Sequence, residues 1–322
     1  MKKLFFFSSL VFLIAACQPN PPSTTQSNMG EAQTERAVDL ESPSNLTTTN
    51  NQVELLDAGS ESREELRFTP EENTTQTVEM MITQEITQSA QGQAADSPEI
   101  PPIQMAINTQ VREVDANGNI HIDVTYSDVQ LMGDENEQLR SQIEQLEGMK
   151  GSMVVSDRGI IQDANWEFPE GVQPNTQQLF EQITNSTNRI TTPIPSEPVG
   201  PGARWQVTDT VETNEFDINQ RGTYELVERD NNTIVLDSQI EQQAPQQEID
   251  SPGIPDDVSV ALESLDGQGS GTIRLNLTHL LPMSANLSTE TNTNVAVETP
   301  QTEQAQTFAQ NIQTEMTIES QE

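Results

Sequence analysis

The residues that decide the fold are 103–129, with the sequence IQMAINTQVREVDANGNIHIDVTYSDV. Apolar and polar residues alternate on both sides of the central DANGN (115–119), which is the period-two pattern of a half-buried β-strand. Asn-Gly tolerates the positive φ angles that tight hairpin turns need. The stretch therefore predicts two antiparallel strands, 103–114 and 120–129, joined by a hairpin turn.

The same alternation recurs along most of the chain, beginning with Leu66-Arg67-Phe68. It predicts further strands at 78–86, 151–155, 160–168, 204–211, 216–228, 233–240, 271–280, 283–297 and 308–318. Three segments instead place apolar residues three and four apart, and predict short helices at 135–148, 175–189 and 255–265. Gly267, and the triplet Gly269-Ser270-Gly271, are interpreted as turns. The fold class that follows is mainly antiparallel β with a few short helices.

The two halves of this region repeat the order of their motifs. IHID (120–123) corresponds to IVLD (234–237), and ANW (164–166) corresponds to ANL (285–287). An internal duplication accounts for this, although antiparallel sheets with Gly turns also resemble one another without common origin. The predicted units are a first β repeat at 63–174, a helical linker at 175–201 and a second β repeat at 202–322. Because open sheet edges invite pairing, we expect the half-barrel-like repeats either to share a sheet edge or to close on each other, with 283–297 and 308–318 as the closing hairpin.

The N-terminus has the pattern of a secretory signal. Lys2 and Lys3 precede an apolar stretch of about a dozen residues, too short to cross a bilayer, which takes about 20. The stretch ends in Ala15-Ala16-Cys17, and Cys17 is the only cysteine of the chain. This ending resembles the lipobox of bacterial lipoproteins, which implies cleavage between Ala16 and Cys17 and acylation of the Cys17 thiol. The alternative is an ordinary signal peptide with a cysteine near the cut by chance.

The lipobox makes residues 1–16 a signal peptide and residues 17–62 a lipidated tether. The tether is rich in Pro, Ser, Thr, Asn, Gln and Glu, so it cannot bury enough apolar surface to order itself and is expected to be disordered. Acyl chains on Cys17 would hold the protein in a membrane and leave no thiol for a disulfide or a metal. In enterobacterial lipoproteins an Asp after the cysteine retains the protein at the inner membrane; Gln18 favours the outer membrane of the cell envelope.

The composition excludes one class of partner. The 322 residues carry a net charge of −37, with 33% hydrophobic and 4% aromatic residues. So negative a chain has no basic patch with which to neutralise phosphates, which excludes nucleic acid. The acids are spread among Gln, Asn and Thr, as on a solvated surface. The low aromatic content indicates a thin, sheet-based core.

Two passages carry a further resemblance. PSEPVGPGARW (195–205) and LPMSA (281–285), with the lipobox and the tether, resemble an uncharacterised family of bacterial lipoproteins whose signature is Pro-Val-Gly-x-Gly-x-x-Trp. That resemblance covers the chain from about residue 66 onward and implies no established activity. More distantly, strands wrapped around helices in an envelope lipoprotein are similar to the half-barrels of LolA- and LppX-type lipid carriers. That similarity concerns the fold alone.

The sequence offers no catalytic constellation, no metal site and no cofactor motif. His121 and His279 are the only histidines and each falls within a strand pattern. The Gly-x-Ser-x-Gly pattern of a nucleophile elbow is absent. The many carboxylates leave a carboxylate-based hydrolase as a third hypothesis, against which stands the shortage of aromatic platforms for sugar.

The leading hypothesis is a membrane-anchored envelope lipoprotein whose non-catalytic β domain binds an apolar or lipid ligand. Trp205, Met80, Met105 and Met153 are the residues predicted to line such a site, because methionine adapts to varied apolar shapes. The alternative for the methionines is gap-filling in a core, and for Trp205 it is a plug at the core's end. The alternative function is a structural or interaction module of the cell envelope without a small-molecule ligand, and the sequence identifies no protein partner.

Overall fold

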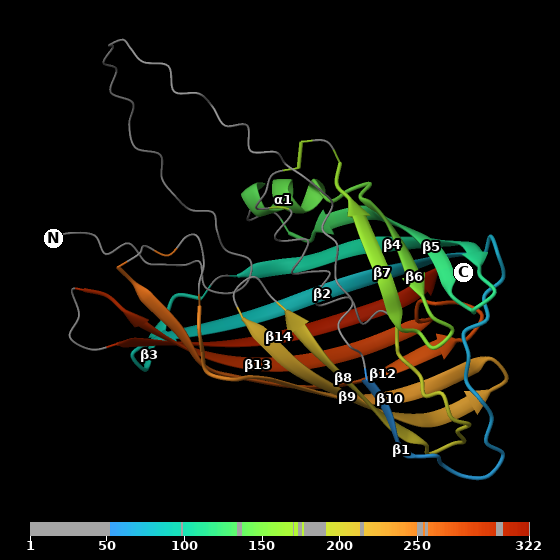
Figure 1. Ribbon diagram of the computed structural model, residues 1–322. Coiled ribbons are helices and arrows are strands. Elements are labelled where there is room, and N and C mark those ends of the chain that lie inside the picture. Colours follow the sequence, from blue (N-terminus) through green and yellow to red (C-terminus); the bar gives the residue numbers. More distant parts are fainter. Residues whose placement is uncertain are drawn as a thin grey trace, which may run out of the picture.

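The computed structural model describes residues 52–97, 99–133, 137–169, 171–172, 176, 191–212, 216–249, 254, 257–300 and 305–321. The strands are β1 (Gln52–Asp57), β2 (Thr75–Ala90), β3 (Gln93–Ala95), β4 (Ile100–Val114), β5 (Ile120–Leu131), β6 (Lys150–Val155), β7 (Ile161–Glu167), β8 (Arg204–Glu212), β9 (Asp217–Asp230), β10 (Thr233–Ala244), β11 (Gln247–Glu248), β12 (Ser259–Asn276), β13 (Ser284–Glu298) and β14 (Gln306–Gln321). Helix α1 (Glu137–Glu144) lies between β5 and β6 (Figure 1).

All these strands belong to one open antiparallel sheet. Its order is β1-β8-β9-β10-β12-β13-β14-β2-β4-β5-β6-β7, with β3 beside β2 and β11 beside β12. The sheet coils, so that β8 and β9 pass in front of β12 to β14 in the view of Figure 1. The predicted mainly antiparallel β fold is confirmed. Its face that carries the hydrophobic core is called the inner face below, and the opposite one the outer face.

The halves of the chain meet as expected, at a shared sheet edge. The last strand, β14, pairs with β2 along its whole length, from Phe308↔Ala90 to Gln321↔Thr77. β13 and β14 form the predicted hairpin. In each half, successive strands follow one another across the sheet in the same direction, and the hairpin β4–β5 occupies the position that β9–β10 has in the other half. Superposition of the two halves stays a prediction.

The predicted helix at 135–148 is confirmed as α1, whereas the predicted helix at 255–265 is wrong. Residues 259–276 form β12, and a β-bulge lies between Leu262 and Ser264. Because the bulge adds a residue to the strand, Leu262 and Leu265 both face the core although they are three apart. The bulge therefore produces an apolar spacing of three residues, which in the sequence is typical of a helix. The predicted helix at 175–189 lies outside the described residues, except for Thr176.

The interpretation of the β12 glycines as turns is also wrong. Gly267, Gly269 and Gly271 form no turn; they lie within β12, alternate on its inner face and pair with β13. A Cβ on Gly271 would lie 2.1 Å from the carbonyl oxygen of Asn286 and 2.5 Å from Cδ2 of Leu287. Glycine in a strand permits such close approach and lets the sheet bend sharply.

Two predicted boundaries near the N-terminus, the end of the tether and the start of the first strand, are also wrong. The predicted tether, 17–62, includes Gln52–Asp57, which is β1 and pairs with β8 from Gln52↔Thr208 onward. Val53 and Leu55 pack against the core, so this short segment buries enough to be ordered. Leu66 and Phe68, predicted to open the first strand, lie in a buried loop before β2 instead. Residues 17–51 lie outside the described residues.

Candidate functional site

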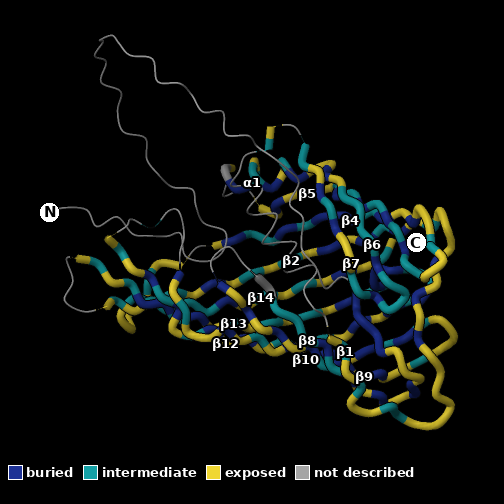
Figure 2. Tube along the Cα trace, viewed as in Figure 1, coloured by how far each residue is buried: buried dark blue, intermediate teal, exposed yellow. Residues whose placement is uncertain are grey.

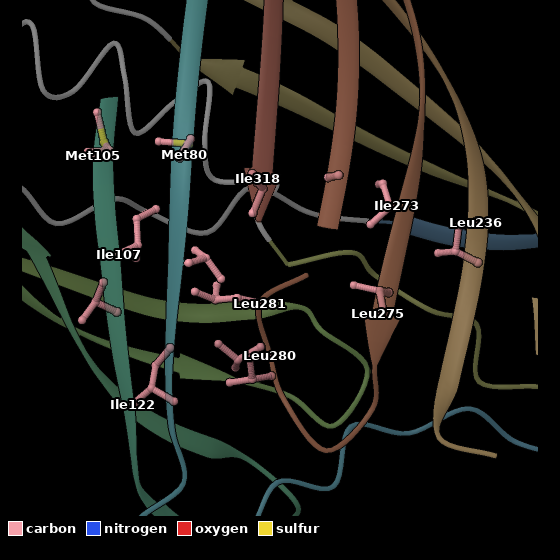
Figure 3. Packing of buried hydrophobic residues seen from close by; sticks show 14 of the residues in the cluster. Met80, Met105, Ile107, Ile122, Leu236, Ile273, Leu275, Leu280, Leu281 and Ile318 are labelled. Carbon is pink, nitrogen blue, oxygen red and sulfur yellow. The ribbon is translucent and has the colours of Figure 1, made fainter. Parts of the chain in front are cut away.

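One end of the inner face is packed by loops. Leu66 and Phe68 from the β1–β2 connection, Ile194 and Val199 from the segment before β8, and Leu280 and Leu281 from the β12–β13 turn all join one core cluster. Figure 3 shows Leu280 and Leu281 between β2 and β12, facing the side chains of the strands. Buried residues therefore gather at this end of the molecule (Figure 2).

Arg158, in the turn between β6 and β7, ties these loops together. Its guanidinium donates hydrogen bonds to the carbonyl oxygens of Leu66 (2.6 Å), Pro195 (2.7 Å) and Ser196 (3.1 Å). These carbonyls have no partner on a strand, and the partly buried guanidinium of Arg158 supplies the hydrogen bonds instead. No sequence motif predicts that Arg158 binds these loops, because the three carbonyls come from distant parts of the chain.

The predicted ligand-lining residues lie in that packed core. Trp205 is fully buried on β8; its Nε1–H donates to the carbonyl oxygen of Pro193 (2.9 Å), and its ring stacks on Tyr224 at 5.9 Å. Met80 and Met105 are buried as a cross-strand pair of β2 and β4, and Figure 3 shows them side by side. Met153, on β6, is half-buried against the same cluster. In the described part of the chain, these four side chains pack against other protein side chains, as core residues do.

The inner face carries no charge on the central strands. Every charged residue of β2, β10, β12, β13 and β14 is exposed; these residues are Glu79, Glu85, Asp237, Glu241, Glu263, Asp266, Arg274, Glu290, Glu298, Glu315 and Glu319. The side chains that alternate with them, facing the core, are apolar, amide, hydroxyl or glycine. In a chain with 20% charged residues, this segregation makes the inner face an uncharged surface.

The middle of that face is only half-buried. We define the inner band as two rows of three residues across β2, β14 and β13: Ile82, Met316 and Leu287, then Gln84, Thr314 and Thr289. All six are of intermediate exposure, whereas Met80 and Ile318 in the preceding row are buried. The first row is apolar and packs against the core cluster. In the second row, Nε2 of Gln84 donates to Oγ1 of Thr314 (3.3 Å). The band is thus amphipathic along the strand direction.

Beyond the inner band, the next row contains the buried pair Ile86 and Ile312, and neutral polar side chains lie beside and beyond this pair. Gln242 on β10 donates to Oε1 of Gln220 on β9 (2.7 Å) and accepts from Oγ1 of Thr291 on β13 (3.3 Å). Gln88 and Gln310 oppose each other in the β2–β14 pair. Each position was visible in the sequence as a polar residue in a strand pattern. Only the register shows that they share one face.

His279 and the hairpin turn at 115–119 make structural contacts. His279 accompanies the buried leucines of the β12–β13 turn, and its ring Nδ1 lies 3.1 Å from Oγ1 of Thr278. Asp115 accepts hydrogen bonds from the backbone N–H and the side-chain amide of Asn119 (both 2.9 Å), and these bonds lower its pKa. Among the described residues, no three His, Cys, Asp or Glu side chains form a group that could hold a metal ion.

Burial lowers the pKa of His279 below 6.5. A lowered pKa means that the unfolded chain binds the proton more readily, so stability rises with pH through this range. We expect the unfolding free energy to fall as pH drops below about 6.5 and towards the lower, folded-state pKa. Urea unfolding of the full chain at pH 7.0, 6.5, 6.0 and 5.5 would measure this dependence, and His279→Gln should flatten it. An equal slope in both proteins would contradict the assignment.

A hollow lies at the end of β10 and β12 that is away from the packed loops. It has a volume of about 360 Å³, opens widely to solvent and is lined by Asn219, Gln243, Ala244, Pro245, Ser264, Leu265 and Asp266. Polar and apolar groups share its walls, and it holds no pair of facing carboxylates. It gives the hydrolase hypothesis no support.

Residues 175–279 match a family of unknown function (DUF6263). The matched region includes β8, β9, β10 and β12, and it leaves out β13, β14 and the first half of the sheet. No curated protein matches the chain. Within the described part of the chain, no helix is both long and apolar enough to span a membrane. Ala16 and Cys17, the predicted cleavage and lipidation residues, lie outside the described residues.

Proposed function

We propose that the protein is a lipid-anchored component of a bacterial cell envelope whose non-catalytic β domain binds an apolar ligand on its inner face. The observation that carries the binding proposal is the inner band: six neighbouring inward side chains, uncharged and half-exposed, beside a packed core. Inward positions of a finished core are normally buried. Partial exposure of Ile82, Leu287 and Met316 leaves apolar surface that a ligand would cover, at a gain of about 25 cal/mol per Å².

This proposal shifts the site from its predicted place. Met80, paired with Met105, lies one row before Ile82 on the same face of β2, and Trp205 belongs to the same core cluster. Met153 lies further along the sheet, on β6. The structural-module alternative keeps the same fold and differs in one respect: the inner band would hold no ligand.

Native mass spectrometry of the full-length protein, released from membranes with detergent, tests the proposal. We expect a population with an additional non-covalent mass in the lipid range, lost on organic extraction. Leu287→Glu, which places a charge in the apolar row, should remove that mass. Asn286→Glu, at an exposed position next to it on the outer face, should keep it. Absence of any bound mass in the wild-type protein would favour the structural module.

The anchor makes a separate prediction at Cys17. Replacing Cys17 with Ala removes the thiol that accepts the acyl chains, so the protein should leave the membrane fraction or persist as an uncut precursor. Fractionation followed by intact-mass measurement distinguishes these outcomes from retention. A Cys17→Ala protein that is processed and still remains with the membranes would refute lipidation.

A further inference from the structure

We infer that the inner band selects an uncharged amphiphile, with an acyl chain and a hydroxyl- or amide-bearing head, over anionic and zwitterionic lipids. The inference rests on the proposed function, because it names the class of ligand for the same site. It depends on the polar row, Gln84, Thr314 and Thr289, which the binding proposal itself does not use.

The two rows of the band divide it between two chemistries. Ile82, Met316 and Leu287 offer only carbon and sulfur, whereas Gln84, Thr314 and Thr289 offer one amide and two hydroxyls. The rows are two residues apart along each strand, about 7 Å. A ligand with a chain on the first row would therefore place its head group on the second.

The polar row can satisfy a neutral head group. A hydroxyl both donates and accepts, and an amide has two donors and one acceptor oxygen. Nε2 of Gln84 uses one donor on Thr314, and no hydrogen bond links the Thr289 side chain to another described residue. The next row along the strands holds Thr291 and Gln242, which are also uncharged and only partly buried. Two other members of that row, Ile86 and Ile312, are buried. The hydroxyl and amide groups match the hydroxyls of a glyceryl or sugar head.

Among the described residues of these central strands, a charged head group finds no counter-ion. No inward side chain of β2, β10, β12, β13 or β14 is a cation, and Arg274, the only basic residue of these strands, is exposed on the outer face. Taking a phosphate or carboxylate out of water without a partner is unfavourable. The exposed carboxylates of the outer face and the net charge of −37 add a repulsive field for anions.

Small residues beside the band make space for the band's own side chains. Gly269 and Gly271 continue the two rows onto β12, opposite Thr289 and Leu287. Cγ2 of Thr289 lies 2.6 Å from the place of a Cβ on Gly269, so any larger residue would push the threonine out of position. The glycines hold the polar row in its present geometry.

The test uses three ligands with the same oleoyl chain: monooleoylglycerol, oleate and oleoyl-lysophosphatidylcholine. Each is titrated into the full-length protein in detergent and its bound fraction is read by native mass spectrometry. We expect wild-type protein to bind monooleoylglycerol at least tenfold more tightly than the other two. Thr314→Val, which removes one hydroxyl at nearly constant volume, should reduce that ratio severalfold.

A charge reversal separates selection from general affinity. Thr314→Lys places a cation in the polar row and should shift the preference towards oleate at least tenfold. Thr317→Lys adds the same charge on the exposed outer face of the same strand and should leave the ratio unchanged. Because all variants share one detergent, partition into micelles cancels in the comparison. Failure of all three ligands to bind would overturn the proposed function. Binding of oleate as tight as that of monooleoylglycerol to wild type, or equal shifts in the two lysine variants, would overturn this inference alone.

Discussion

Trp205→Ala should destabilise the protein by about 3–5 kcal/mol, the usual cost of removing a large buried aromatic side chain. Trp205 is fully buried, stacks on Tyr224 and donates to the carbonyl oxygen of Pro193. Alanine would leave a cavity where β8 meets the loop before it, and would leave that carbonyl unpaired. Urea unfolding of the full chain, followed by tyrosine and tryptophan fluorescence and by circular dichroism, measures the change.

Trp205→Phe separates the two contributions of the indole. It keeps a ring against Tyr224 but loses the hydrogen bond, so it should cost less than alanine. Val227→Ala, at a position on β9 that is 49% exposed, serves as the control and should change stability by no more than about 0.5 kcal/mol. If Trp205→Ala were as stable as this control, Trp205 would not be a core residue and its ligand-stacking role would return.

Gly271→Val should destabilise the protein by about 3 kcal/mol, near the upper end of ordinary overpacking. The new Cβ would meet the backbone oxygen of Asn286 at 2.1 Å, and backbone cannot move aside as a flexible side chain can. The strand pair β12–β13 would have to separate or flatten locally. The same urea titration would show a lower midpoint.

Ser270→Val is the matched control for the glycine. Ser270 is the neighbour of Gly271 on β12 and points to the exposed outer face, where a β-branched residue is well tolerated. Its unfolding midpoint should stay close to that of the wild type. If both variants lost the same stability, the cause would be a general intolerance of β12 for valine. The close approach of β13 to Gly271 would then not explain the loss.

The sequence predicted the strands because alternation is a local property. The hairpin of β4 with β5, the helix α1 and the hairpin of β13 with β14 all appeared near their observed bounds. It failed at β12, where the bulge after Leu262 changed the apparent period, and at Gly267 to Gly271, where glycine serves curvature within a strand. A period cannot be read correctly through a bulge that only the partner strand reveals.

The site was harder to predict than the fold, since it depends on register between strands. Met80 and Met105 were named as adaptable apolar residues, and the structure buries both. Gln84, Thr314 and Thr289 carried no signal of their own. They become neighbours through the pairing of β14 with β13 and of β2 with β14, and the second of these joins residues more than 200 positions apart.

The pairing of β14 with β2 also constrains the order in which the sheet can fold. β2 is made early and β14 last, so the centre of the sheet cannot form until the end of the chain is available. Contacts of such long sequence separation slow folding, because the loop between them must be closed first. Until then β2 has a free edge at the middle of the future sheet. If the chain is exported segment by segment, as the proposed anchor requires, its two halves would stay separate until β14 arrived to join them.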